Sequence, residues 1–267
     1  MKKFLFILFF FTTCSLVAQN FEQQRDSLIA RIKEVAAVQD SLQKTIAAQQ
    51  FLQLFEETLS QTKSMNFDFD SIPFVGKVVS PDKKIRVFTW CVPFGKSYQY
   101  YGILQHTINK KEKTVVLFDK KYSITKPETT TLKNGDWFGA LYSQMVQNKV
   151  GKQIYYTLFG FDFYSETNNR KLLDVLYFGE NNEPIFGAPL FNNEQWKACR
   201  ILFEYNADSQ FFFDYLPRKK MIVYQSLVAE GEENNFVPTE IFDGLIFKNG
   251  EWLLQKNVEL SPKDFRK

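Results

Sequence analysis

Residues 244–254 read GLIFKNGEWLL, two short apolar runs on either side of an Asn-Gly pair. Asn249 and Gly250 accept the positive φ angles of a tight two-residue turn, so this pattern is the strongest short-range signal for a β-hairpin. Similar runs of Val, Ile, Tyr, Phe, Thr and Trp, separated by turn residues, continue back to Pro73. The chain from there onward is therefore predicted to be an antiparallel β domain.

The predicted strands are short and closely spaced. They cover residues 74–79, 85–92, 98–108, 114–119, 137–146, 153–163, 172–178, 186–189, 199–205, 210–215, 221–228, 244–248 and 251–254. Most connections are too short for the helical crossover that parallel neighbours require, which favours an antiparallel meander. Steps of an aromatic residue followed by Gly do not recur at the roughly 40–45 residues of a propeller blade. We therefore expect irregular stacked sheets or a bent sandwich.

A helical arm is predicted to precede this β domain. Residues 20–63 contain no Gly or Pro and are rich in good helix formers. The apolar positions with helical spacing are Leu28, Ile32, Val35, Leu42 and Ile46. One interpretation is a coiled-coil seam through which the chain forms a homo-oligomer. The other, which we favour because the seam is short, is two or three helices packed on the β domain, each beginning at an Asp-Ser pair.

The N-terminal residues are typical of an export signal. Lys2 and Lys3 precede an apolar run at residues 4–11, and small or polar residues lead to Ala18. A membrane-spanning helix needs about 20 consecutive apolar residues, and Thr12 interrupts this run too early. We expect residues 1–18 to be a cleaved signal peptide, residues 19–66 the helical arm and residues 67–267 the β domain. The mature protein is then expected in the periplasm, on the cell surface or outside the cell.

Cys14 leaves a second route open at this end of the chain. A lipoprotein would be acylated on such a cysteine after signal cleavage. Small residues usually stand directly before an acylated cysteine and Leu three positions before it, whereas here Thr13 and Phe11 occupy those places. We therefore favour the cleaved signal over the lipid anchor.

Composition excludes several classes of function. The formal net charge is +3, and removing residues 1–18 subtracts the charges of Lys2 and Lys3 to leave +1. This near-neutral balance predicts no nucleic-acid footprint, and no later segment is apolar enough for a transmembrane helix. His106 is the only histidine, so most metal sites and His-dependent mechanisms are excluded. We expect no metal and no cofactor.

Two cysteines, Cys91 and Cys199, remain in the mature chain. An exported protein can form disulfides, so the two could be bridged. Both also lie in apolar stretches, where two separately buried thiols explain them equally well. The sequence leaves the two alternatives open, with the separate thiols slightly favoured.

One turn carries residues that could bind a ligand. Asp162, Tyr164 and Glu166 fall in the segment 161–170, a predicted hairpin tip. An aromatic ring and carboxylates on an exposed loop could hold a sugar, and two carboxyl groups facing each other across a cleft could hydrolyse one. An ordinary polar hairpin explains the same residues and is favoured.

Three clusters of adjacent aromatic residues place rings on both faces of a strand. They are residues 98–101, 161–164 and 211–213. Successive side chains of a strand point to opposite faces. Either both faces are covered in each cluster, or an aromatic patch is exposed and marks a binding surface.

Several segments together carry a resemblance to a known family. They are residues 136–142, 155–162, 186–189, 200–205, 219–224 and 248–252. In order and spacing the chain resembles, over most of residues 67–258, a family of uncharacterised secreted Bacteroidota proteins with no established activity. That resemblance implies an exported location and no catalytic residues. The chain departs from the family pattern at residues 225–227 and 237–239, where Gln-Ser-Leu and Val-Pro-Thr replace Asp-His-Leu and Gly-Pro-Asp.

The functional expectation follows from these points. We expect an exported cell-envelope protein with a non-enzymatic role in structure or binding, whose partner is an envelope protein or a glycan. The alternative is a carboxylate-dependent hydrolase or a carbohydrate-binding module that uses Asp162, Tyr164 and Glu166.

Overall fold

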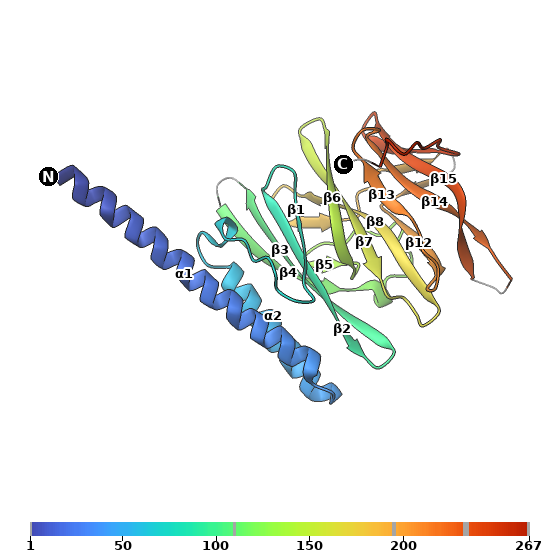
Figure 1. Ribbon diagram of the computed structural model, residues 1–267. Coiled ribbons are helices and arrows are strands. Elements are labelled where there is room, and N and C mark those ends of the chain that lie inside the picture. The colour runs from blue at the N-terminus through green and yellow to red at the C-terminus, as the bar shows by residue number, and fades with distance from the viewer. Residues whose placement is uncertain (1, 109–110, 194–195, 232–234, 266–267) are drawn as a thin grey trace. The chain divides into compact units, whose positions relative to one another are not determined.

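The computed structural model describes residues 2–108, 111–193, 196–231 and 235–265. Two helices come first, and short strands in mainly antiparallel sheets follow (Figure 1). The predicted fold class, mainly β with a preceding helical segment, is confirmed. The chain divides into two compact units. One contains Met1–Val75 with Ile103–Val116, and the other contains Gly76–Gly102 with Leu117–Lys267.

The first unit contains a helical hairpin. Helix α1 spans Lys2–Ala37 and α2 spans Ser41–Leu59, and the two lie side by side (Figure 1). Asp40 begins α2 as predicted, because its carboxylate accepts a hydrogen bond of 2.9 Å from the backbone N–H of Gln43. The other Asp-Ser pair does not begin a helix: it lies inside α1, where the Ser27 hydroxyl donates to the Gln23 carbonyl.

The apolar seam drawn from residue 28 to residue 46 is divided between the two helices. Leu28, Ile32 and Val35 of α1 are buried, whereas Leu42 and Ile46 of α2 are 67% and 43% exposed. The chain turns between the helices, so the heptad register cannot continue from α1 into α2. The buried face of α2 consists instead of Ala47, Ala48, Phe51, Phe55, Thr58 and Leu59. The helices therefore pack through two separate stripes.

The same unit includes parts of two strands, β3 (Ser97–Ile108) and β4 (Lys111–Asp119). The buried Gln105 amide of β3 donates to the Leu59 carbonyl at 2.7 Å and to the Ser64 hydroxyl at 2.6 Å. These bonds satisfy polar groups at the end of α2 and at the short 3₁₀ turn Ser64–Asn66. The residues after α2 are thereby joined to the strand within this unit.

Three sheets account for the strands of the described residues. The first has the order β1-β2-β3-β4-β5, with β1 at Gly76–Val79, β2 at Ile85–Phe94 and β5 at Asp136–Trp137. The second has the order β12-β8-β7-β6 with β9 beside β8, where β6 is Leu141–Val150, β7 Gln153–Asp162, β8 Asn168–Phe178, β9 Pro184–Phe186 and β12 Arg200–Asn206. The third has the order β11-β10-β16-β15-β14-β13, where β10 is Phe191–Asn193, β11 Trp196–Ala198, β13 Phe213–Leu216, β14 Met221–Ala229, β15 Phe236–Lys248 and β16 Glu251–Gln255.

The hairpin predicted from residues 244–254 is present. Strands β15 and β16 pair antiparallel, with Lys248 opposite Glu251. Asn249 and Gly250 between them have φ values of 52° and 90°, the left-handed region that this turn requires. Among the strand pairings that the structure describes, β4–β5 and β10–β16 differ from the antiparallel expectation because they are parallel.

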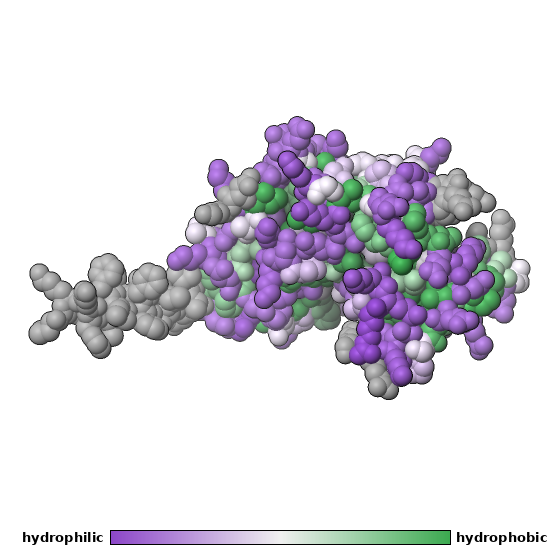
Figure 2. All heavy atoms as spheres, turned by 90° about the horizontal axis from the view of Figure 1, so that it is seen from above, coloured by the Kyte–Doolittle hydropathy of each residue, from purple (hydrophilic) through white to green (hydrophobic). Residues whose placement is uncertain are grey.

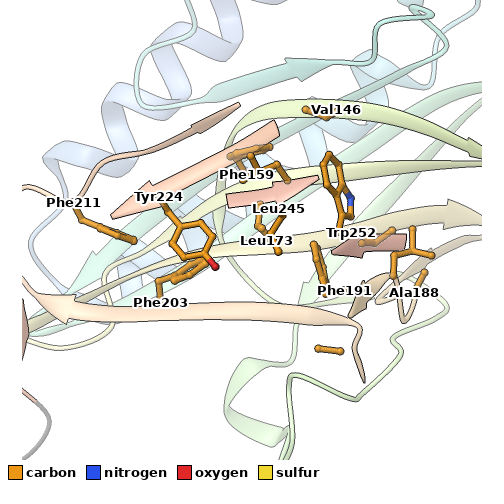
Figure 3. Close-up of a cluster of buried hydrophobic side chains, with 14 of the residues drawn as sticks. Val146, Phe159, Leu173, Ala188, Phe191, Phe203, Phe211, Tyr224, Leu245 and Trp252 are labelled. Carbon is orange, nitrogen blue, oxygen red and sulfur yellow. The ribbon is translucent and has the colours of Figure 1, made fainter. Parts of the chain in front are cut away.

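The main core of the second unit lies between the second and third sheets (Figure 3). Trp252 of β16 is its largest member, and its indole N–H donates to the Thr157 hydroxyl of β7 at 2.9 Å. In the second sheet β6 is contacted by β1 and β2, and Tyr156–Gly160 and Leu172–Leu176 of β7 and β8 are buried without alternation, as in strands covered on both faces. Figure 2 shows one face of the molecule, on which hydrophilic side chains predominate.

Residues 211–213 are explained by packing on both faces. Phe211 and Phe213 contact the main core. Phe212 points to the other side and packs edge-on against Phe242 and Phe265, at centroid distances of 5.7 and 5.4 Å. This cluster is therefore structural.

His106 of β3 is buried, and we expect it to make stability depend on pH. Burial and, secondarily, Lys113 lower its pKa from 6.5 to about 4, because both disfavour the charged imidazolium. Between these values the unfolded chain binds a proton that the folded chain does not, so stability is lost as the pH falls from 6.5 toward 4. Urea titrations across that window should show a smaller loss for His106→Asn than for the wild type. Equal losses would contradict the assignment.

Candidate functional site

A long irregular segment connects β4 to β5 in the second unit. We call residues 120–135 the strap. Its only regular element is the 3₁₀ turn Lys121–Ser123. Loops of more than about 12–15 residues without secondary structure are uncommon inside compact domains, and those that are ordered usually have a function. The strap is thus a candidate functional segment.

The strap is anchored at its beginning by a buried lysine. Lys121 Nζ lies 2.6 Å from Asp162 Oδ1 and 3.9 Å from Asp119 Oδ2, and the three side chains are 2%, 0% and 4% exposed. The same ammonium lies 3.5 Å from the centre of the Tyr100 ring. A buried charge is tolerated only with such partners, because removing it from water costs several kcal/mol, about the energy that a good pair returns. Lys121 therefore holds this end of the strap against β7.

Asp119 closes the same anchor from the end of β4. Its Oδ1 accepts hydrogen bonds from the backbone N–H groups of Lys121 at 2.9 Å and Gly139 at 3.1 Å. Burial raises the pKa of Asp119, while Lys121 and the two backbone donors act in the opposite direction. A Cβ on residue 139 would lie 2.2 Å from Asp119 Cγ. Glycine is therefore required there by the carboxylate that packs against it.

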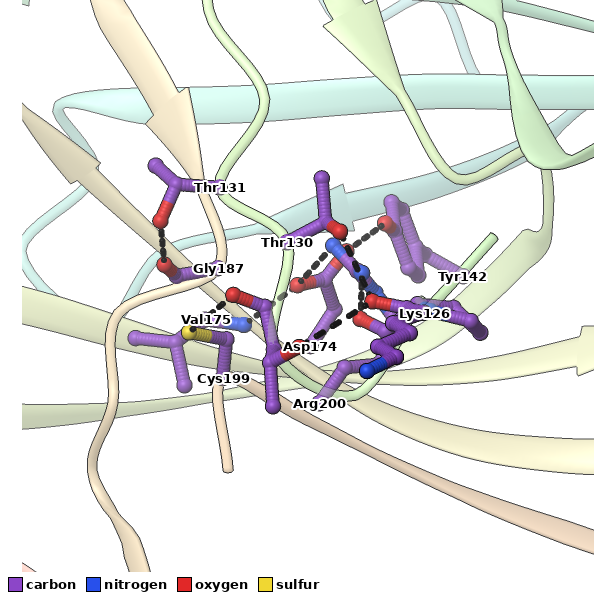
Figure 4. A network of polar contacts seen from close by, with 11 residues as sticks. Lys126, Thr130, Thr131, Tyr142, Asp174, Val175, Gly187, Cys199 and Arg200 are labelled. Atoms are coloured by element: carbon purple, nitrogen blue, oxygen red, sulfur yellow. Dashed lines mark hydrogen bonds and ion pairs between the residues drawn. The ribbon is translucent and has the colours of Figure 1, made fainter. Parts of the chain in front are cut away.

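A second buried ion pair holds the middle of the strap (Figure 4). Arg200 of β12 binds both carboxylate oxygens of its cross-strand partner Asp174 at 2.9 Å, and both side chains are fully buried. The other end of the guanidinium donates to the Pro127 carbonyl of the strap at 2.6 Å. The Tyr142 hydroxyl lies 3.4 Å from Asp174 Oδ2. Arg200 thus connects the second sheet to the strap backbone.

Backbone bonds complete the attachment. The Glu128 carbonyl accepts from the N–H of Cys199 at 2.6 Å, and the Thr131 hydroxyl donates to the Gly187 carbonyl at 2.9 Å. Leu132 forms an antiparallel bridge with Phe186 of β9. The strap is therefore fixed along most of its length.

A groove of about 610 Å³ opens along the strap. Its lining consists of Lys120, Ser123, Ile124, Thr125, Lys126, Thr129, Thr130, Leu132 and Asp136. Lys120 lies 3.8 Å from Asp136, but the Lys126 ammonium has no ion-pair partner within the described residues. The groove is therefore rich in hydroxyl groups and has one uncommitted cation.

The structure does not bring the predicted binding-loop residues together. Asp162 is the last residue of β7 and is fully buried against Lys121, so its expected place on an exposed tip is wrong. Glu166 is exposed and pairs with Lys96 at 2.7 Å. Tyr164 is partly exposed, and the Arg170 guanidinium lies 3.1 Å from its ring centre. Strand alternation could not reveal the Asp162 pairing, because Lys121 comes from a segment with no strand pattern.

Both cysteines of the second unit are free thiols. Cys91 of β2 is half-buried, and burial raises its pKa to about 11; Lys121 lowers this pKa and Asp162 raises it, both to a smaller extent. Cys199 is buried, its sulfur 3.7 Å from the Thr129 carbonyl of the strap. Of the two possibilities that the sequence left open, the structure therefore contains the two separate thiols.

We expect substitutions of the two carboxylates of the predicted binding loop, Asp162 and Glu166, to differ sharply in their effect on the free energy of unfolding. Asp162→Asn leaves the Lys121 ammonium without its closest partner, which should lower the free energy of unfolding by about 3–5 kcal/mol. Glu166→Gln is the matched control. It breaks an exposed pair and should cost less than about 1 kcal/mol. Urea unfolding followed by tryptophan fluorescence measures both. Similar losses in the two variants would show that Lys121 and Asp162 do not anchor the strap.

The described residues contain no group of three or more His, Cys, Asp or Glu side chains arranged to hold a metal ion. Among the described helices, none is long and apolar enough to cross a membrane. Comparisons of the chain with protein-family models, with curated proteins and with solved structures found no match.

Proposed function

We propose that this is an exported binding protein of the cell envelope that holds a glycan in the strap groove. The observation that supports this most strongly is the contrast between the two sides of the strap. Buried ion pairs hold it from beneath, through Lys121 and Arg200. Hydroxyl groups and the ammonium of Lys126 line its groove.

The buried anchors favour binding because they fix the loop before a ligand arrives. Ordering a long loop at the moment of binding lowers affinity, whereas a loop already held in place avoids that cost. Sites supported by locked neighbouring groups are also more exact in geometry. Arg200 and Asp174 hold the Pro127 carbonyl in this way.

The lining suits a ligand rich in hydroxyl groups. Thr125 presents a hydroxyl that can both donate and accept hydrogen bonds, whereas the hydroxyls of Thr129 and Thr130 donate to the Lys126 carbonyl and offer a ligand their acceptor capacity. Ile124 and Leu132 add a small apolar surface. The groove is shallow and wide open to solvent, which suits a ligand that stays partly hydrated. A sugar segment with a carboxylate or other acceptor beside Lys126 fits this lining.

Binding accounts for these residues better than hydrolysis. A glycosidase needs two carboxyl groups facing its substrate, about 5–10 Å apart. Asp162 is buried with Lys121, and Glu166 is paired with Lys96. The carboxylates that the hydrolase hypothesis requires are thus bound to two different lysines.

Export rests on the basic and apolar residues at the N-terminus and on the resemblance to secreted proteins. We expect the mature chain to begin at Gln19, after cleavage behind Ala18. Mass spectrometry of the protein recovered from the envelope and medium of the producing cells would identify this terminus. A lipid-modified Cys14 as the first residue would establish the lipoprotein route instead, and an intact Met1 would contradict export by a cleaved signal.

The groove proposal is tested by removing its uncommitted donors. We expect the Thr125→Val/Lys126→Ala variant to bind glycans at least about tenfold more weakly than the wild type, a loss of about 1.4 kcal/mol. Lys133→Ala is the matched control, because Lys133 is an exposed strap lysine outside the groove lining. Screening should use a glycan array with neutral and uronic-acid oligosaccharides, followed by calorimetry on the hits. Equal losses in both variants, or no hit on the array, would overturn the proposal.

A further inference from the structure

The anchor at the beginning of the strap contains more negative than positive charge. Lys121 supplies one ammonium group, whereas Asp119 and Asp162 supply two carboxylates. All three side chains are almost fully buried, and buried charges are screened much less than exposed ones. When both carboxylates are ionised, the cluster therefore holds one uncompensated negative charge away from water.

Aromatic side chains keep water away from this cluster. The centre of the Tyr100 ring lies 3.5 Å from Lys121 Nζ, and the Tyr100 hydroxyl accepts a hydrogen bond of 2.7 Å from the backbone N–H of Phe163. These contacts join the aromatic clusters at residues 98–101 and 161–164 beside the anchor. Solvent therefore does little to relieve the excess charge.

The other titratable groups around the anchor are neutral at neutral pH. Burial raises the pKa of the Cys91 thiol of β2 to about 11 and also raises the pKa of Tyr100 of β3. Burial likewise raises the pKa of Tyr142 of β6 and, to a smaller degree of burial, that of Tyr122 on the strap. None of these four groups supplies a positive charge, so none offsets the excess.

The nearby cations are already matched by other carboxylates. Arg170 of β8 lies opposite Asp162, but its guanidinium forms a two-pronged pair with Glu204, at 3.1 and 2.8 Å. Lys120, at the start of the strap, lies 3.8 Å from Asp136 and outside the buried cluster. The excess negative charge therefore stays within the anchor.

The geometry also indicates which carboxylate binds a proton. Asp162 Oδ1 lies 2.6 Å from Lys121 Nζ, whereas Asp119 Oδ2 lies 3.9 Å from it, so the ammonium neutralises Asp162 first. Burial raises the pKa of Asp119; Lys121 and the backbone N–H groups of Lys121 and Gly139 lower it, and Asp162 adds a smaller increase. The net shift is upward, which makes Asp119 the proton acceptor.

We propose that the anchor is a proton-binding site, in which a carboxylate oxygen of Asp119 takes up one proton from the solvent as the medium becomes acidic. Uptake leaves Lys121 and Asp162 as a balanced pair, and the strap is then held more firmly. Lys120, between Asp119 and Lys121 in the chain, lines the strap groove, so the proton binds next to that surface. The proposal concerns the anchor and does not depend on what the groove binds.

The sign of the effect on stability follows from linkage. Because the pKa of Asp119 lies above 3.8 in the folded chain, the folded chain holds this proton over a pH range in which the unfolded chain has lost it. Asp119 therefore makes the protein more stable as the pH falls through its folded pKa, and this gain is complete below 3.8. The direction is opposite to the one expected for His106.

An NMR titration of the side-chain carboxyl carbons of the wild type measures the proton directly. We expect the midpoint of the Asp119 signal to lie above 3.8. Its signal is assigned through the backbone of the wild type, and its disappearance in Asp119→Asn checks the assignment. A midpoint at or below 3.8 would overturn the proposal, and this result needs no variant to fold.

Urea unfolding tests the consequence for stability. Between about pH 7.5 and about pH 4.5 the wild type should gain on Asp119→Asn by at least about threefold in the ratio of their unfolding equilibrium constants. The contribution of His106 cancels, because both chains contain it. Asp136→Asn is the matched control: it removes an exposed carboxylate paired with Lys120 and should show no such gain. An equal gain against both variants, or a loss against Asp119→Asn on acidification, would contradict proton uptake at Asp119.

Discussion

The ion pair between Lys121 and Asp162 is the interaction on which the described site depends. It places one charge from an irregular segment against one charge at the end of β7, with both side chains removed from water. Desolvation makes such a pair roughly neutral in net stability, but removal of either partner leaves an uncompensated buried charge. The pair therefore contributes little net stability, but it fixes the position of the turn Lys121–Ser123 against the end of β7.

The second sheet is the framework that makes these anchors effective. Its central strands β7 and β8 are covered on both faces, which gives a low-dielectric surrounding for Asp174 and Arg200. A charge in such surroundings has few alternative partners. The guanidinium of Arg200 is fixed by the sheet and donates to the Pro127 carbonyl, so it holds a part of the strap that belongs to no strand. Polar groups inside the β framework thus shape a loop at its surface.

Much of the fold could be predicted from local patterns. The Asn-Gly hairpin, the helix start at Asp40 and the succession of short strands depend on turn chemistry, capping and alternation, which operate within a few residues. The candidate site could not be predicted in this way. Asp162 looked like a ligand-binding carboxylate because it precedes a turn, and its partner Lys121 lies in a segment with neither helical nor strand periodicity. Likewise Leu42 continued the spacing of Leu28 and Ile32, yet it is exposed because the chain turns before α2.

The sequence by itself therefore determined the mainly β class, the preceding helices and the residues that form turns, because these properties follow from local backbone preference and hydrophobic period. Tertiary structure alone decided which charges are buried and which aromatic rings face water. Burial is a property of three-dimensional neighbours, and the partners of Asp162, Arg200 and Tyr164 come from distant segments or from the opposite side of a turn. For the same reason Phe211 lies in the core whereas Tyr122 is exposed.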